Sequence, residues 1–224
     1  FRRVLFRSLY YSTFSASSTY STIGSSSAPF AGVYDGNNQQ VSQFSGSQGL
    51  FAAIGVGGVV KNWKVESTRI SASADTTGIV AGTNAGTIEN VSLDKYCSIS
   101  SSGKTVGGIC GNLSAGGTIR SCTSAANVTS SSSDSESAVG GIAGALSENA
   151  NIDACLATGS VSGGTGASAV GGIAGRAAQK SSIDSCYAAA GVSGKDGVGG
   201  VLGYAGGVPA SVSNNVASGS IAGT

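Results

Sequence analysis

The sequence predicts an all-β protein, specifically a right-handed parallel β-solenoid of about six to seven rungs of 28–33 residues. Three observations favour this fold class. Glycine makes up 37 of the 224 residues and recurs at fixed positions, a unit of about thirty residues repeats along the chain, and no segment shows helical apolar periodicity. A sandwich or propeller would need regular hairpin signals, but Asn-Gly is absent and Asp-Gly occurs only at 35–36 and 196–197.

The first phrase of the repeat is Val-Gly-Gly-Ile-x-Gly. It occurs at 106–111, 139–144 and 170–175, with a close variant at 198–203 and weaker copies at 49–55 and 77–82. We expect its glycines to form sharp corners with positive φ and to leave space in a narrow interior. The structural glycines predicted in this way are Gly107, Gly108, Gly111, Gly140, Gly141, Gly144, Gly171, Gly172, Gly175, Gly199, Gly200 and Gly203.

Two further phrases complete each unit. The second phrase begins at intervals of 28, 31, 33, 31 and 29 residues, with the aliphatic residues Val60, Ile88, Ile119, Ile152, Ile183 and Val212. The third is a short β-branched segment, centred on Val128, Val161, Val192 and Ile221. Three short strands per unit are typical of a three-faced rung, in which each strand pairs with its counterpart about 4.8 Å away in the next rung.

Stacking of rungs places equivalent residues in columns. The residues that open the second phrase should form one buried column, and a second should contain Ile54, Ile79, Ile109, Ile142, Ile173 and Val201. Asn62, Asn90 and Asn214 share a column that we interpret as a bend, because asparagine tolerates left-handed backbone conformations.

Cysteines form a further column. Cys122, Cys155 and Cys186 should be buried, reduced thiols, and Trp63 occupies the same column position and should be core. Cys97 and Cys110 could form a disulfide if their rungs align. The odd count of five and the absence of Cys-x-x-Cys indicate neither a full disulfide framework nor a zinc site.

Charged residues follow the first residue of the second phrase. Lys61, Glu89, Arg120 and Asp153 alternate in sign, which predicts a ladder of ion pairs, and Asp184 then repeats the negative charge. Two stacked carboxylates could bind Ca²⁺ or act on a glycosidic bond, so Asp153 and Asp184 are the weak metal candidates of the chain. A solvated surface pair is the preferred interpretation.

Composition excludes several function classes. The chain has no histidine, which removes Ser-His triads and His-ligated metal sites, and we expect no cofactor and no catalytic residues. Its formal charge of +1 gives no basic field for nucleic acid, and no stretch approaches the roughly 20 apolar residues of a membrane span.

The chain divides into three parts. Residues 1–8 are interpreted as a translated sequencing adapter, with a mitochondrial presequence or a clipped secretory signal as alternatives. Without their three arginines the net charge would be −2, from 9 basic and 11 acidic residues. Residues 9–29 are an incomplete lead-in, and residues 30–224 form the solenoid, which we expect to continue beyond the C-terminus because the last rung shows no polar cap.

The repeat resembles the GLUG motif of bacterial surface and secreted proteins. The resemblance rests on Val-Gly-Gly-Ile-Ala-Gly at 139–144, on the phrase from Asn151 to Gly163 and on the lead-in from Tyr20 to Gly36. It implies an extracellular or cell-surface location. GLUG arrays occur in adhesins, in large cell-wall proteins and beside the catalytic part of IgA-cleaving metallopeptidases of the M26 type, which need a His-Glu-x-x-His motif that this chain lacks.

Three functions follow from these observations. The leading hypothesis is a non-enzymatic structural or adhesive module of a large bacterial surface protein, whose partner would be a host or environmental glycan or protein surface. The second is a β-helix that binds or degrades polysaccharide. The third is an accessory domain of a surface metallopeptidase whose catalytic part lies elsewhere.

Overall fold

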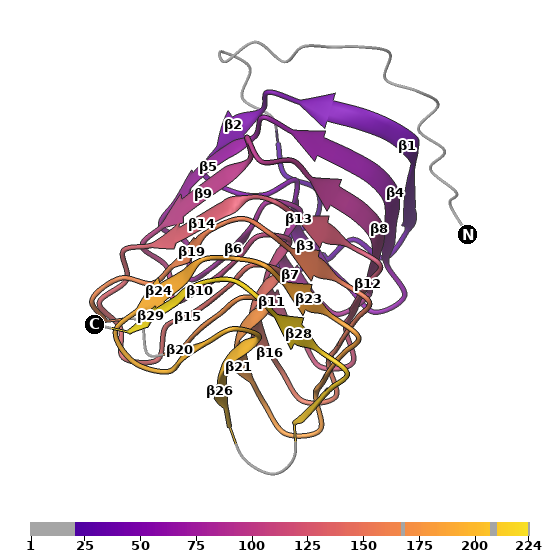
Figure 1. The fold of residues 1–224 in the computed structure, drawn as a ribbon. Coiled ribbons are helices and arrows are strands. Elements are labelled where there is room, and N and C mark those ends of the chain that lie inside the picture. The colour runs from indigo at the N-terminus through magenta and orange to yellow at the C-terminus, as the bar shows by residue number, and fades with distance from the viewer. Residues whose placement is uncertain (1–20, 167–168, 207–209, 224) are drawn as a thin grey trace.

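The computed structural model describes residues 21–166, 169–206 and 210–223. Within these ranges every regular element is a strand, and the strands stack into a parallel β-solenoid of about six rungs (Figure 1), which confirms the predicted fold class. The interpretation of residues 1–8, and most of the predicted lead-in at 9–29, lie outside the described ranges. Residues 30–166 run continuously through the first rungs of the solenoid.

The strands form four sheets rather than three faces. The largest, here called the bent sheet, has 11 strands: β1 (Val33–Ser42), β4 (Val59–Glu66), β8 (Thr87–Leu93), β12 (Thr118–Arg120), β13 (Thr123–Ser124), β17 (Asn151–Asp153), β18 (Leu156–Ala157), β22 (Ser182–Asp184), β23 (Tyr187–Ala188), β27 (Ser211–Ser213) and β28 (Val216–Ala217). The seven-stranded sheet contains β2 (Ser45–Gly46), β5 (Arg69–Ala72), β9 (Ser98–Ser101), β14 (Asn127–Ser130), β19 (Val161–Ser162), β24 (Val192–Gly194) and β29 (Ile221–Gly223).

The other two sheets both come from the glycine-rich phrase. One has five strands: β6 (Thr76–Gly78), β10 (Thr105–Gly107), β15 (Ala138–Gly140), β20 (Ala169–Gly171) and β25 (Val198–Gly199). The other has six: β3 (Phe51–Ile54), β7 (Ala81–Asn84), β11 (Cys110–Leu113), β16 (Ala143–Leu146), β21 (Ala174–Ala177) and β26 (Leu202–Ala205). The phrase therefore contains a corner between two strands, where sequence analysis expected a single strand.

The bent sheet follows the predicted register. Val60 pairs with Ile88, and the column continues in register through Ile119, Ile152, Ile183 and Val212. Five of these six side chains are fully buried, and Val212 in the last rung is 44% exposed. This column is the apolar centre of the bent sheet.

The other predicted apolar column is wrong at two positions. Cys110 pairs with Ala81, and therefore Ile109 lies beside Val80 rather than Ile79. Ile79 instead aligns with Gly108 of the next rung. Ile54 lies at the end of β3 and pairs with Asn84 of β7, outside the predicted column. Both side chains are nevertheless buried, because the small residues of this phrase allow neighbouring rungs to fill the interior differently.

The repeat glycines are required for space, not for positive φ. A Cβ on Gly140 would lie 2.0 Å from the Ala143 carbonyl oxygen, and one on Gly144 would lie 2.5 Å from the Val106 nitrogen. Each glycine of the phrase has a comparable obstacle, and none of the twelve predicted glycines has positive φ. The expectation of positive φ at these corners is therefore wrong, whereas close backbone approach explains them.

Left-handed backbone occurs instead at the bend of the bent sheet. Asn62, Asn90 and Asn214 have φ values of 54°, 50° and 55°, which confirms the predicted bend. In the intervening rungs the same position is left-handed at Ser121, Ala154 and Ser185. Asparagine adopts this conformation at little cost, whereas alanine and serine do so only when the surrounding rungs hold them.

Candidate functional site

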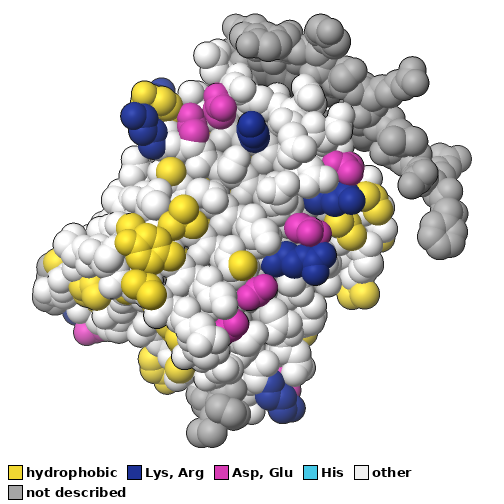
Figure 2. All heavy atoms as spheres, turned by 45° about the vertical axis from the view of Figure 1, so that its right-hand side comes forward, with side chains coloured by type: hydrophobic (Ala, Val, Ile, Leu, Met, Phe, Trp, Pro, Cys, Tyr) yellow, Lys and Arg dark blue, Asp and Glu magenta, His cyan; other side chains and the backbone are white. Residues whose placement is uncertain are grey.

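The bent sheet carries the charged residues in one exposed row. Successive register pairs bring together a charge column of Asp35, Lys61, Glu89, Arg120, Asp153 and Asp184. Figure 2 shows this row of alternating colours, which ends in two acidic side chains. The order predicted from the sequence is thus confirmed, and Asp35 is an additional member because β1 pairs with β4.

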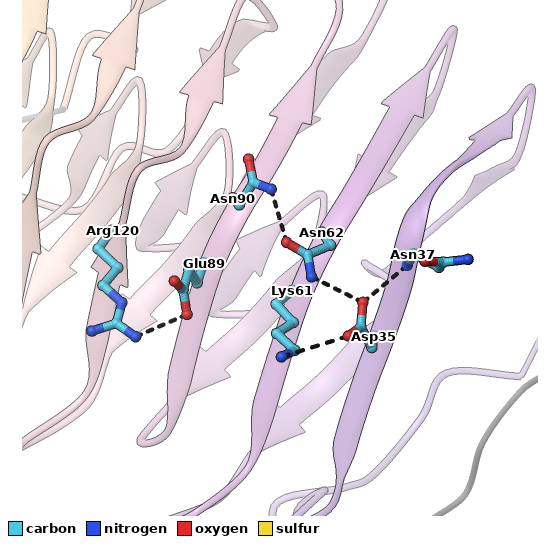
Figure 3. A network of polar contacts seen from close by, with 7 residues as sticks. All are labelled: Asp35, Asn37, Lys61, Asn62, Glu89, Asn90 and Arg120. Carbon is cyan, nitrogen blue, oxygen red and sulfur yellow. Dashed lines mark hydrogen bonds and ion pairs between the residues drawn. The ribbon is translucent and has the colours of Figure 1, made fainter.

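Two ion pairs form within the charge column. The Lys61 ammonium lies 3.5 Å from the Asp35 carboxylate, and the Arg120 guanidinium lies 2.8 Å from that of Glu89 (Figure 3). A hydrogen bond from the Asn37 backbone N–H, together with Asn62 and Lys61, lowers the pKa of Asp35. The hydrogen bond with Glu89 raises the pKa of Arg120. The ladder therefore consists of separate pairs of opposite charge rather than one continuous chain.

An amide ladder runs beside these pairs. The Asn90 side-chain amide donates to the Asn62 side-chain oxygen at 2.8 Å, and the Asn62 amide donates to Asp35 at 3.0 Å (Figure 3). Each side chain extends from the left-handed bend of its rung. Asparagine at these positions therefore both permits the bend and connects neighbouring rungs.

The two acidic residues that end the charge column differ in their surroundings. Asp184 accepts hydrogen bonds from the Ser213 hydroxyl at 2.6 Å, the Asn214 amide at 2.9 Å and the Ser185 hydroxyl at 3.0 Å. These donors lower the pKa of Asp184, with Ser213 the largest contributor. The Asp153 carboxylate makes no hydrogen bond or ion pair with any residue in the described part of the chain, although Arg120 in the preceding rung attracts it electrostatically.

The structure places the two metal candidates side by side without completing a metal site. Asp153 and Asp184 are in register on β17 and β22. Across residues 21–166, 169–206 and 210–223, no three His, Cys, Asp or Glu side chains gather closely enough to hold a metal ion. Hydrogen-bond donors already surround Asp184, so the arrangement resembles a solvated acidic pair more than a calcium site.

A second exposed row lies beyond the bend on the same sheet. The register runs from Lys64 through Ser92 and Thr123 to three apolar residues, Leu156, Tyr187 and Val216, here called the apolar column. Tyr187 is 41% exposed, and its hydroxyl is 2.6 Å from the Ser218 hydroxyl. Figure 2 shows a patch of hydrophobic side chains on the same side of the molecule as the charged row, with white atoms between the patch and the row. Sequence analysis missed this row because its outward residues change in chemical type from rung to rung.

The cysteines contribute to the core. Cys122, Cys155 and Cys186 are buried and reduced, as predicted, and Cys97 and Cys110 are also free thiols. A hydrogen bond with the Cys122 thiol raises the pKa of Cys155, one with Cys155 raises that of Cys186, and burial raises that of Cys97 to about 12. The thiols of Cys97, Cys155 and Cys186 therefore stay protonated and unreactive at neutral pH. Trp63, in the same column, is 3% exposed and belongs to the core.

Two further sequence expectations concern the buried residues of the repeat and membrane-spanning segments. The structural residues predicted from the repeat lie in the stacked interior, where Ile119, Ile152 and Ile183 are fully buried. No helix that could cross a membrane occurs in the described ranges of the chain.

Comparison with known proteins identifies the repeat. A family model described as "The GLUG motif" matches residues 166–193, which include strands β20 to β23 and part of β24. A search of curated proteins finds no match. The resemblance drawn from the sequence is therefore supported at the motif that the chain repeats.

A solved structure shares the architecture. It is described as a "putative immunoglobulin A1 protease" from Bacteroides ovatus, with 25% sequence identity and a TM-score of 0.63. The match covers 73% of this chain and 52% of that one, so the chain spans about half the length of the solved protein. The chain therefore carries a GLUG motif within a β-solenoid that is similar to part of that protein.

Proposed function

We propose that this chain is a non-enzymatic structural and adhesive repeat module of a larger bacterial surface or secreted protein. The observation that carries the proposal is the succession of parallel register pairs along the bent sheet, from Asp35 in β1 to Ser213 in β27, with one register shift inside β1. A stack of this kind presents a long, rigid face, and solenoids bind partners through such extended surfaces. The GLUG motif and the similarity to a solved protein described as a "putative immunoglobulin A1 protease" support an extracellular location.

The exposed chemistry supports binding more than catalysis. Ion pairs or hydrogen bonds hold most of the charge column, and all five thiols are buried. A general acid or base needs a group whose pKa lies near the working pH and which can reach a substrate. The exposed groups whose pKa is shifted, such as Asp35 and Arg120, are moved further away from neutral pH.

Two alternatives have specific support. Binding of polysaccharide is favoured by the exposed ring of Tyr187 and by the stacked carboxylates of Asp153 and Asp184, which lie on the same sheet. A place beside a peptidase domain is favoured by the similarity to the protein described as an immunoglobulin A1 protease. Both are compatible with a module that binds while another part of the parent protein acts.

Retention of coated beads tests the proposal. Beads carrying the full chain are passed over surfaces coated with mucin, immunoglobulin A1, bacterial polysaccharide or albumin, and retention is measured under flow with soluble chain as competitor. We expect competable retention on at least one surface other than albumin, and none with beads carrying heat-denatured chain. Failure to bind any surface overturns the adhesive role.

A parallel assay tests the non-enzymatic part. The chain is incubated with immunoglobulin A1 and with the same polysaccharides, and products are followed by electrophoresis and mass spectrometry. We expect no cleavage. Cleavage that persists through repurification of the chain contradicts the proposal and favours the degradative alternative.

A further inference from the structure

Three of the five thiols form one column in the interior. Cys122, Cys155 and Cys186 align because the strands on both sides of them pair in register, β12 with β17 and β22 before the bend and β13 with β18 and β23 after it. All three side chains are buried, and each sulfur lies 3.1 or 3.2 Å from the carbonyl oxygen two residues earlier in its own rung. The side chains therefore share one orientation, and the sulfurs repeat from rung to rung.

The sulfurs of this column contact one another. Hydrogen bonds join the Cys155 thiol to the Cys122 thiol on one side and to the Cys186 thiol on the other. The Cys155 backbone N–H also donates to the Cys186 sulfur, at 3.4 Å. Cys155 is therefore the centre of a row of three thiols, each within reach of the next.

The spacing of the sulfurs suits a bridging ion better than a disulfide. Neighbouring strands of a sheet lie about 4.8 Å apart, and side chains that share one orientation keep about that separation. A disulfide needs Cβ atoms about 3.8 Å apart and sulfurs about 2.05 Å apart. A metal–thiolate bond is about 2.3 Å long, so a cation held in line between two sulfurs spans about 4.6 Å. That span matches one rung step.

We propose that Cys155, together with Cys122 or Cys186, binds a soft monovalent cation of the Cu(I) type in linear coordination by two sulfurs. Cysteine sulfur selects such cations over hard ones. Zinc fits less well, because it takes four ligands in a tetrahedron, and in the described ranges no group of three His, Cys, Asp or Glu side chains gathers closely enough to provide them. The inference is independent of the proposed adhesive function.

Binding exchanges a proton for the cation. The Cys155 and Cys186 thiols are protonated in the free chain, so one of the pair releases its proton to solvent, and each sulfur then shares an electron pair with Cu(I). The bound group carries no net charge, which limits the cost of placing it in an apolar interior. The Cys155 N–H that donates to the Cys186 sulfur would stabilise negative charge there.

Competition with a chelator tests the proposal. The full chain is titrated, without oxygen, into Cu(I) held by bicinchoninate, whose colour reports the Cu(I) that it still binds. Each mixture is left to equilibrate, because buried thiols are reached through local opening of the rungs. We expect the chain to withdraw a single equivalent of Cu(I). X-ray absorption of the loaded chain should show two sulfur neighbours at about 2.3 Å.

Variants locate the site. Cys155→Ala removes the thiol shared by both pairs and should abolish the uptake of Cu(I). The double variant Cys122→Ala and Cys186→Ala leaves Cys155 without a thiol neighbour in its column and should give the same loss, so the result does not depend on one change. Cys110→Ala is the matched control, because this equally buried thiol pairs with alanine in both neighbouring rungs, and uptake should be unchanged. Thermal melting of each variant verifies the fold.

Each other outcome overturns the proposal. Equal uptake by the parent and Cys155→Ala, loss of uptake in Cys110→Ala, or failure of the parent to withdraw Cu(I) from the chelator removes the site. Oxygen or nitrogen neighbours in the X-ray absorption spectrum assign the bound Cu(I) to other groups. Mass spectrometry of the chain kept in air without reductant that finds Cys155 in a disulfide assigns the column to a covalent cross-link instead. None of these results affects the retention of coated beads, so the adhesive function is tested separately.

Discussion

The first and last rungs of the solenoid have a similar backbone path but different side chains. At the N-terminal end the bent sheet has long strands, of ten residues in β1 and eight in β4, and its interior holds a cluster of aromatic rings. Tyr34 lies 5.3 Å from Trp63 and 5.7 Å from Phe51, centroid to centroid. Further along, the same sheet is divided into pairs of short strands, such as β17 and β18.

One column summarises this difference. The residue that follows the left-handed bend is Trp63, then Val91, then Cys122, Cys155 and Cys186. Side-chain volume falls along the series while the position remains buried throughout. At this position the interior of the N-terminal rungs is therefore filled by a large side chain and that of the later rungs by small ones, and in the later rungs the paired glycines lie in close contact with neighbouring backbone. Each repeat therefore packs its interior with its own set of side chains.

The largest expected loss of stability comes from adding a Cβ to a glycine of the repeat phrase in a later rung. Gly140→Ala would bring a Cβ to 2.0 Å from the Ala143 carbonyl oxygen and 2.8 Å from the Ala174 Cα. Both obstacles are backbone, so relief requires movement of two rungs, and we expect a loss of about 3 kcal/mol or more in the free energy of unfolding. Urea denaturation measures it. Gly223→Ala, in which the added Cβ would meet nothing within 4 Å, is the control. Similar stability of both variants would show that neighbouring backbone can move to accommodate a Cβ at Gly140.

The next largest loss of stability comes from replacing the large side chain at the N-terminal end of this column. Trp63→Cys gives the first position of the column the residue found in later rungs and leaves a cavity. Removing a buried tryptophan costs about 3–5 kcal/mol, and we expect the lower end because the indole N–H has no hydrogen-bond partner within the described residues. Val91→Cys, one rung further on, should cost about 1 kcal/mol. Equal losses of stability in Trp63→Cys and Val91→Cys would contradict the inference that the first rungs depend on large buried side chains.

The sequence predicted the bent sheet better than the glycine-rich corner for a physical reason. Around Ile88 and Ile119 the chain alternates buried and exposed residues and adds charges and bends, and a one-residue shift would bury a charge. Around Ile79 the phrase is composed of small and aliphatic residues on both sides. A shift there exchanges one apolar side chain for another, so nothing in the sequence distinguished Ile79 from Val80 as the partner of Ile109.

The exposed face was only partly predictable. The order of Lys61, Glu89, Arg120, Asp153 and Asp184 follows from the repeat spacing alone, and the register pairs confirm it. Asp35 was missed because Asp35-Gly36 was interpreted only as a turn signal and a lead-in. The apolar column was not predicted because its outward residues change in chemical type from rung to rung, from Lys64 to Tyr187.

The buried thiol of Cys97 provides a pH test of the core. Burial raises the pKa of Cys97 to about 12, whereas a cysteine in the unfolded chain titrates near 8.5. The native state therefore holds its proton while the unfolded state loses it, so stability is fully present below about pH 8.5 and falls as pH rises toward 12. From these two values the Cys97 thiol alone should contribute a loss of about 1.5–2 kcal/mol in the free energy of unfolding between pH 8.5 and 10, measured by urea denaturation as the difference between the parent and Cys97→Ala. Cys97→Ala should reduce this slope, and an unchanged slope would assign the effect to other groups.

The smallest effect concerns the charge column that connects both regions. Arg120→Glu breaks the pair with Glu89 and creates four successive acidic positions in register, because Asp153 and Asp184 follow directly. Since the side chains are exposed, we expect the melting temperature to fall by only about 1–2 °C at low salt and to recover at about 1 M salt. Arg120→Gln, which removes the pair without adding repulsion, should lie between the variant and the parent. A loss of melting temperature that does not depend on salt would mean that Arg120 stabilises the rungs through packing of its aliphatic stem. The ladder of opposite charges would then play no part in holding the N-terminal and later rungs in register.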